Sequence, residues 1–176
     1  MPSKLTITVI VAAVALTAGN AFFHYSRRAA ASTLADQPAA LVAGTRWPDV
    51  KLALLSGASG PQMTGPLPTG CRIMVAFSVT CPHCHSAAQQ ESAVPDSVRL
   101  PVVWISETDD ARAREFASML SPTSTIRFGG PKVFKALKLR AVPAAFLVTP
   151  GNKVRSITGY AGSETDHRIL RSWCRT

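Results

Sequence analysis

The chain has 176 residues, of which 47% are hydrophobic and 16% are charged, so it can bury a core and is not globally disordered. Its 19 Lys and Arg against 10 Asp and Glu give a formal net charge of +9. No nucleic-acid-binding motif accompanies this charge, which argues against a nucleic acid as partner. Anionic lipid headgroups or acidic proteins suit such a surface better.

The first predicted element is an uncharged stretch of 19 residues, 5–23, with Lys4 before it and Arg27 and Arg28 after it. A helix of this length crosses a hydrocarbon core of about 30 Å. We therefore expect residues 1–25 to form an N-terminal transmembrane helix that anchors the chain. A cleaved signal peptide is the alternative.

Both interpretations export the rest of the chain if the N-terminus stays on the inner side of the membrane. We expect a single-pass protein of the bacterial inner membrane with its folded domain in the periplasm, or else a protein secreted to the periplasm after signal cleavage. Residues 26–43 are rich in Ala and Ser and predict a linker. The folded domain is then expected at 44–176.

Hydrophobic patterning and turn signals predict the elements of this domain. In chain order they are a strand at 50–55, a loop or an edge hairpin at 56–70, a buried strand at 73–79, a helix from 82 to 93, a buried strand at 102–106, a helix from 110 to about 120, a helix at 131–139, a strand at 144–149, a turn at 150–152, a strand at 154–158 and a final helix capped by Ser163. This order predicts an α/β fold, a central mixed β-sheet flanked by α-helices.

Four cysteines are present, Cys71, Cys81, Cys84 and Cys174. One Cys-x-x-Cys in an even set is compatible with a redox pair plus a structural pair, or with a four-ligand metal site. The isolated positions of Cys71 and Cys174 argue against a zinc site. In an oxidising compartment they favour a disulfide, worth up to about 4–5 kcal/mol for a loop of this length. Two unpaired thiols are the alternative.

The motif Cys81-Pro82-His83-Cys84 follows the apolar run 73–79, which is typical of a strand covered on both faces. Pro82 suits the first turn of a helix, because its missing N–H would be unpaired there. Cys81 is therefore expected at a helix N-terminus, where free N–H groups and the helix dipole stabilise a thiolate. His83 can add a hydrogen bond or a charge to the same sulfur.

This arrangement resembles the thioredoxin fold, in which the motif follows a buried strand and opens a helix. Val142-Pro143, directly before a strand, resembles the cis-proline of that family. The segments 44–57 and 142–159 resemble membrane-anchored thioredoxin-like proteins of the TlpA and ResA type, and the similarity covers roughly residues 44 to 174. The dipeptide Pro-His and Val142 are instead those of DsbA-type proteins.

The resemblance implies a thiol–disulfide oxidoreductase that acts on cysteines of exported proteins. Cys81 and Cys84 would be the catalytic couple, with Pro82, His83 and Pro143 as further catalytic residues. Val142 and Pro143 would bind extended substrate backbone. No cofactor and no metal is implied besides the redox-active disulfide itself.

The implied partners are cysteine-containing substrates and a membrane or soluble protein that resets the pair. The Pro-His dipeptide favours an oxidising potential, well above that of thioredoxin, and a periplasmic reductase of the TlpA/ResA type is the alternative. Haem-maturation members of that branch carry an acidic residue at the position of Ala87. Its absence argues against apocytochrome c as substrate.

Two further hypotheses use the same residues. Cys81 to His85 reads as Cys-x-x-Cys-His, the attachment motif of c-type haem, but a buried strand before it and Pro82 inside it do not suit a small cytochrome. A Cu(I)-binding chaperone of thioredoxin fold would use the two cysteines with His83, His85 or the distant His167.

Overall fold

The computed structural model describes residues 41, 43–139, 141–157 and 159–174. The predicted transmembrane helix and most of the predicted linker lie outside these residues. Within the described part, no helix is both long and apolar enough to cross a membrane. The elements are α2 (Pro61–Thr64), β1 (Arg72–Phe77), α3 (Pro82–Ser92), β2 (Val102–Ser106), α4 (Ala111–Ala117), β3 (Thr125–Phe128), α5 (Gly130–Ala136), β4 (Ala144–Val148), β5 (Val154–Ile157) and α6 (Glu164–Trp173).

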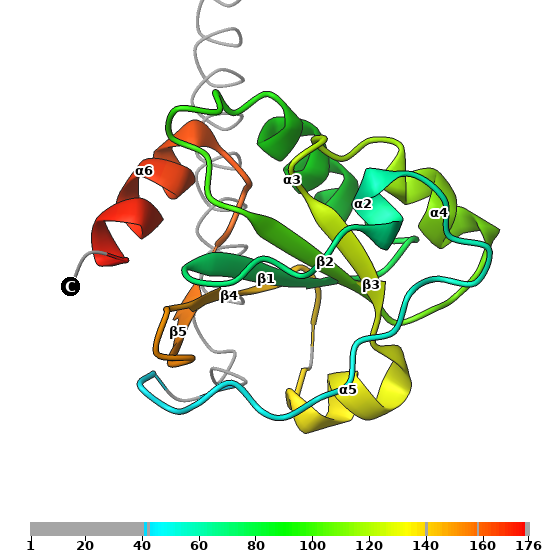
Figure 1. The fold of residues 1–176 in the computed structure, drawn as a ribbon, viewed down its shortest axis with the longest axis horizontal. Coiled ribbons are helices and arrows are strands. Elements are labelled where there is room, and N and C mark those ends of the chain that lie inside the picture. The colour runs from blue at the N-terminus through cyan, green and yellow to red at the C-terminus, as the bar shows by residue number, and fades with distance from the viewer. Residues whose placement is uncertain (1–40, 42, 140, 158, 175–176) are drawn as a thin grey trace, which may run out of the picture. The chain divides into compact units, whose positions relative to one another are not determined.

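The strands form one five-stranded sheet in the order β3-β2-β1-β4-β5 (Figure 1). β1, β2 and β3 are parallel, whereas β4 is antiparallel to both β1 and β5. The carboxyl ends of the three parallel strands therefore lie at the same edge as the start of β4. The register shows this directly, because Ala76 near the end of β1 pairs with Ala144, the first residue of β4.

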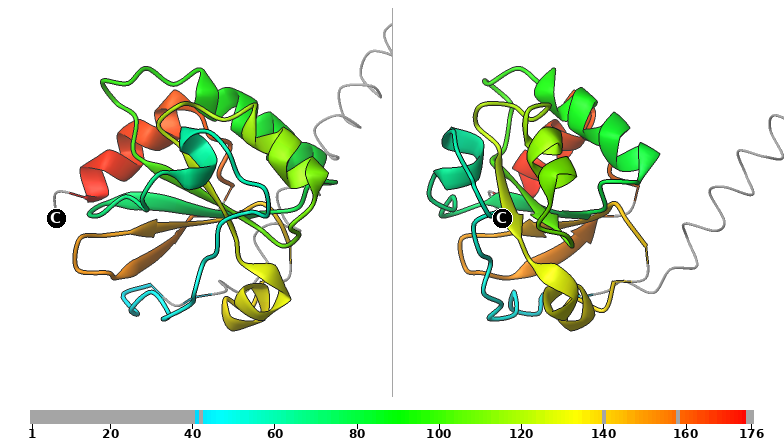
Figure 2. Two further views of the ribbon diagram at one scale, coloured as in Figure 1. Left: turned by 45° about the vertical axis from the view of Figure 1, so that its right-hand side comes forward. Right: turned by 90° about the vertical axis from the view of Figure 1, so that its right-hand side faces the viewer.

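Helices cover both faces of the sheet. α3, α4 and α6 lie on one face and α5 lies on the other, as Figures 1 and 2 show. Successive residues of β1 point to opposite faces, so Val75 and Phe77 enter one buried cluster and Met74 and Ala76 the other. The nearly continuous apolar sequence of this strand follows from that double burial, and the predicted mixed sheet with flanking helices is confirmed.

Residues 50–55 do not form the predicted strand. This segment makes a single antiparallel bridge, between Ala53 and Phe128 of β3. Leu55 packs in the cluster on the α3 face, while Val50 and Leu52 pack against the cluster on the α5 face. Within this segment, only Ala53 exchanges backbone hydrogen bonds with β3, so the pairing stays a single bridge.

Three other predictions were wrong in detail. β3 was not predicted, since its four residues include a buried cation, Arg127, and lack the long apolar run of β1. The 56–70 segment holds the short helix α2 rather than a loop or hairpin throughout, and Arg127 donates hydrogen bonds to the carbonyls of Met63 and Gly65 at its end. α4 ends at Ala117 instead of near residue 120.

A disulfide joins Cys71, just before β1, to Cys174 at the end of α6. The two Cα atoms are 5.9 Å apart and 103 residues separate the cysteines in sequence. This bond ties the last helix to the start of the central strand.

Candidate active site

Cys81 lies at the N-cap of α3, at the sheet edge where β1 ends. Its backbone N–H donates to the Ser78 carbonyl at 3.1 Å, which turns the chain out of the strand. Its sulfur accepts a hydrogen bond from the Cys84 backbone N–H at 3.2 Å. A sulfur thus occupies the place usually taken by a side-chain oxygen, where a negative charge is favoured by the helix terminus.

The sulfurs of Cys81 and Cys84 differ in their surroundings. Both are free thiols; Cys81 is half-buried and Cys84 is fully buried. Desolvation raises the pKa of the Cys84 thiol, and its hydrogen bond with the Cys81 side chain raises it further. Cys81 is therefore the sulfur that a second protein can reach, and Cys84 is the one that stays protonated beneath it.

The loop before β4 brings a distant part of the chain to Cys81. The Val142-Pro143 peptide bond is cis. The Cys81 thiol donates to the Val142 carbonyl at 3.5 Å, although 61 residues separate them in sequence. The four residues Cys81, Cys84, Val142 and Pro143, singled out from the sequence, thus meet at one edge of the sheet.

The two histidines of the motif have different environments. Pro82 and His83 are exposed in the first turn of α3. The hydrogen bond that Cys81 accepts comes from the Cys84 backbone rather than from His83. His85 is half-buried, with its Nε2 2.9 Å from the Val79 carbonyl and its ring edge-on to Phe116 at 5.2 Å. His85 therefore braces the loop that carries Cys81, a role that the sequence analysis did not assign.

A buried polar cluster behind the cysteines was also missed. Glu91 is fully buried and accepts a hydrogen bond from Ser124 at 3.1 Å, and its second oxygen has no partner among the described protein atoms. Desolvation raises the pKa of Glu91, and burial likewise raises the pKa of Tyr160. Glu91 comes seven residues after Cys84, so it lies on the same core-facing side of α3, which is the signal that the sequence offered.

His167 of α6 belongs to this buried region rather than to the exposed surface. Its Nδ1 accepts a hydrogen bond from the Leu100 backbone N–H at 3.0 Å. Desolvation, helped by the charge of Arg99, lowers the pKa of His167 to about 4. His167, the distant histidine of the Cu(I) hypothesis, is thus fully buried, and its Nε2 has no hydrogen-bond partner among the described protein atoms. Among the described residues, His, Cys, Asp and Glu side chains form no group of three or more that suits a metal ion.

The segment that precedes α6 packs closely against α3. Gly162 has φ +74°, and a Cβ on it would lie 2.2 Å from the carbonyl oxygen of Ala87. A side chain at residue 162 is excluded by backbone rather than by a movable group. The segment before α6 can therefore approach the middle of α3 only because residue 162 is Gly.

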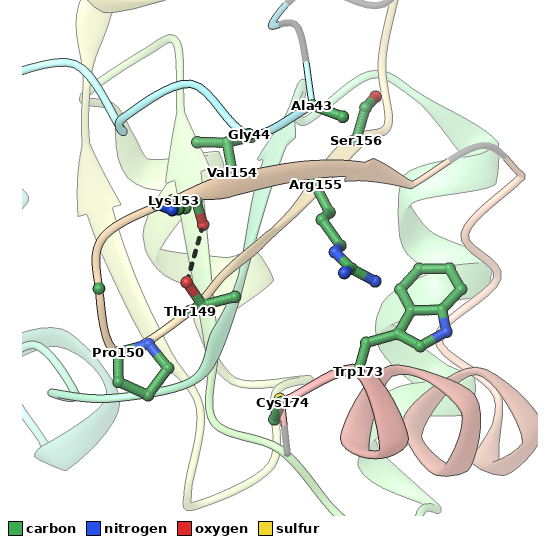
Figure 3. A pocket seen from close by; sticks show the side chains of 11 residues that line it. Ala43, Gly44, Thr149, Pro150, Lys153, Val154, Arg155, Ser156, Trp173 and Cys174 are labelled. Carbon is green, nitrogen blue, oxygen red and sulfur yellow. Dashed lines mark hydrogen bonds between the residues drawn. The ribbon is translucent and has the colours of Figure 1, made fainter. Parts of the chain in front are cut away.

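A pocket of about 1010 Å³ lies elsewhere, between the β4–β5 hairpin and the end of α6 (Figure 3). In that view Arg155 points toward Trp173, and its guanidinium is 5.6 Å from the ring centroid. Val148, at the hairpin end of β4, pairs with Arg72 at the start of β1. The pocket is thus at the opposite end of the sheet from Cys81, and it adjoins the disulfide-bonded Cys174 rather than the free pair.

No protein-family model matches the chain, and no curated protein matches it in sequence. Solved structures do match. A thiol:disulfide interchange protein DsbE from Chlorobium tepidum has a TM-score of 0.54 at 16% identity, over 75% of this chain and 98% of that one. The thioredoxin domain of a thiol-disulfide oxidoreductase from Bacteroides vulgatus has a TM-score of 0.54 at 12% identity, over 74% and 99%. A thioredoxin-like protein from Porphyromonas gingivalis has a TM-score of 0.55 at 17% identity, over 73% of this chain and 91% of that one. The chain therefore has a thioredoxin-like fold.

Proposed function

We propose that the chain is a thiol–disulfide oxidoreductase that oxidises cysteine pairs of exported proteins through Cys81 and Cys84. The observation that carries this proposal is the unequal pair itself: a reachable sulfur at a helix N-cap and a buried thiol directly beside it. The names of similar structures from Chlorobium tepidum and Bacteroides vulgatus agree with this chemistry.

In the oxidising direction, the reaction begins with the Cys81–Cys84 disulfide. A substrate thiolate attacks Cys81 Sγ, forming a mixed disulfide while the Cys84 sulfur leaves with the electron pair and takes a proton. The raised pKa of Cys84 favours that protonation. A second substrate thiolate then attacks the substrate sulfur of the mixed disulfide and releases Cys81 as a thiolate. The substrate loses two electrons and the enzyme gains them.

The loop at Val142 and Pro143 is proposed to hold the substrate during this exchange. The Val142 carbonyl already accepts a hydrogen bond from Cys81, so substrate backbone placed along this loop would lie next to the reacting sulfur. No cofactor is needed, because the cysteine pair itself stores the two electrons.

The oxidising direction rests on the Pro-His dipeptide, which resembles that of DsbA-type proteins, and on the thiolate-stabilising N-cap. A backbone N–H donated to the Cys81 sulfur at a helix N-cap favours the reduced enzyme and hence a higher potential. Reduction of exported disulfides in the manner of TlpA- and ResA-type proteins is the second candidate, favoured by the resemblance of segments 44–57 and 142–159 to that branch.

We place the folded domain in an oxidising compartment, the bacterial periplasm, held there by the anchor predicted at 1–25 or released by cleavage. The Cys71–Cys174 disulfide supports this placement, because such bonds persist outside the reducing cytosol. A membrane or soluble protein would then reoxidise the active pair after each cycle.

The proposal is tested by assaying both directions with the purified chain. The oxidised chain should convert a dithiol peptide to its disulfide, at a rate that depends on Cys81. If the chain neither oxidises that peptide nor reduces insulin disulfides in the presence of dithiothreitol, the proposed function is wrong.

A further inference from the structure

The outward side of α5 and of the turn after it carries three lysines, Lys132, Lys135 and Lys138, called here the α5 lysine face. All three are exposed. The ion pairs among the described residues are made by Arg99, Arg112 and Arg168, so none of them neutralises this face. The opposite side of the helix is apolar and buried against the sheet.

The stretch of sequence that includes this face is basic. Residues 116–163 include seven Lys and Arg and no Asp or Glu. One of the seven, Arg127, is buried and donates to backbone carbonyls, so it does not contribute to the exposed face. Exposed lysines gathered on one helix face attract acidic groups of a partner at a distance.

The α5 lysine face lies on the helix that leads into the active-site loop. α5 begins at the sheet edge where β2 and β3 end, since the Gly129 N–H donates to the Ser106 carbonyl at 2.9 Å. Its buried residues Phe134 and Leu137 share one hydrophobic cluster with Val142. Because Cys81 donates to the Val142 carbonyl, the segment between α5 and β4 connects the helix that carries the lysines to the reactive sulfur.

We propose that the α5 lysine face binds an acidic segment next to the reacting cysteine of the protein substrate. This inference rests on the proposed function and names the substrate class of that same site. A substrate held along the Val142 loop, as proposed above, brings the residues that flank its cysteine toward the helix that precedes this loop. Exposed charges of this kind act mainly on the association rate and are screened over about 8 Å at physiological salt.

The occupant is a protein segment rather than a lipid surface. A membrane lying on the α5 lysine face would also cover the adjoining Val142 loop, which has to stay open for a protein substrate. Anionic lipid is therefore the competing outcome that the experiment must separate.

The test uses the full chain in neutral detergent with two dithiol peptides that differ only in their flanking residues, Glu in one and Gln in the other. We expect kcat/KM to favour the Glu-flanked peptide by about tenfold at low ionic strength, and this preference to fall several-fold at about 0.3 M salt. The double variant Lys132→Gln, Lys135→Gln should lose most of the preference. The charge-reversed variant Lys132→Glu, Lys135→Glu should prefer a Lys-flanked peptide instead.

The matched control is Lys153→Gln, Arg155→Gln, which removes the same charge at the opposite end of the sheet and should keep the preference. Equal turnover of both peptides by the wild type would overturn the docking and leave the oxidoreductase function intact. A preference that survives in both Lys132/Lys135 variants would also overturn it. So would lysine-dependent kinetics seen only in nanodiscs of anionic lipid, which would assign the face to the membrane. Turnover of neither peptide would contradict the proposed function as well.

Discussion

At the scale of single residues, two sulfurs in one helical turn differ in solvation, and the proposed function gives each of them a separate task. Cys81 is partly reachable and capped by a backbone N–H, whereas Cys84 is completely buried and its pKa is raised by desolvation. Thiol–disulfide exchange needs this asymmetry. One sulfur must form the mixed disulfide with the substrate, and the other must act as its leaving group or attack it from the buried side.

Replacement of each cysteine should separate the two tasks. Cys81→Ser should lower dithiol oxidation by more than about 100-fold, because no sulfur is left for the substrate to attack. Cys84→Ser keeps the reachable thiol but removes the resolving one, so it should accumulate mixed disulfides when offered an oxidised substrate. Non-reducing gels and intact mass measure the trapped species. Equal trapping by both variants would contradict the assignment.

His83 and His85 provide a second contrast, between an exposed imidazole and a hydrogen-bonded one. His85→Ala removes the bond to the Val79 carbonyl and the contact with Phe116, so it should cost about 1–2 kcal/mol of unfolding free energy. His83→Ala should leave the melting temperature unchanged and lower the redox potential by about 20–30 mV, or about 1 kcal/mol. Thermal melts and glutathione titration give the two readouts. The reverse pattern would refute these roles.

At the scale of elements, the central strands with long apolar runs could be predicted from the sequence, but the edge strand β3 could not. β1 and β2 are covered on both faces, which imposes a nearly continuous apolar sequence, and both were predicted. β3 is an edge strand with a buried arginine whose partners are carbonyls near residue 65. Whether these four residues form a strand depends on that distant segment, and the local sequence pattern does not reveal the contact.

The same limit applies to the active site. The Cys81–Cys84 motif and the Val142-Pro143 loop have local sequence signals, so both were identified. The bracing role of His85 depends on a carbonyl in the preceding loop. The buried state of Glu91 depends on Ser124 and on the close approach of Gly162 to α3. These tertiary contacts cannot be derived from spacing alone.

The hydrogen bond between His167 of α6 and the Leu100 N–H, just before β2, gives a prediction about pH. Its pKa is lowered to about 4 in the folded protein from an ordinary value of 6.5. The neutral imidazole therefore contributes stability that is complete above pH 6.5 and is lost as the pH falls toward 4. His167→Asn keeps an acceptor for the Leu100 N–H without titrating.

Unfolding free energies of wild type and His167→Asn should be compared between pH 4 and pH 8. At neutral pH the wild type should have the larger unfolding free energy, and this difference should shrink by about 2–3 kcal/mol at pH 4. A difference that stays constant with pH would show that burial does not perturb this histidine.

At the scale of the whole molecule, the two cysteine pairs are at opposite ends of β1. The Cys71–Cys174 disulfide precedes the strand and the redox pair follows it. In the proposed function, this separation allows the first pair to stay oxidised while the second pair is oxidised and reduced in turn. The described domain is thus held together by a bond that the active site does not need.

Removal of the structural bond should therefore affect stability and spare the chemistry. The variant Cys71→Ala, Cys174→Ala should lose up to about 4–5 kcal/mol of unfolding free energy in the chain-entropy model, since the bond closes a loop of 103 residues. Below its melting temperature it should oxidise dithiols at a rate close to that of the wild type. Loss of activity in a folded sample of this variant would show that the second pair takes part in electron transfer.

The central claim, an oxidising thiol–disulfide couple at Cys81 and Cys84, is tested most directly by equilibrating that pair with glutathione buffers and measuring the oxidised fraction. The account predicts a redox potential well above the value of about −270 mV that is typical of thioredoxin. A potential at or below about −270 mV would contradict it and assign the chain to the reductases.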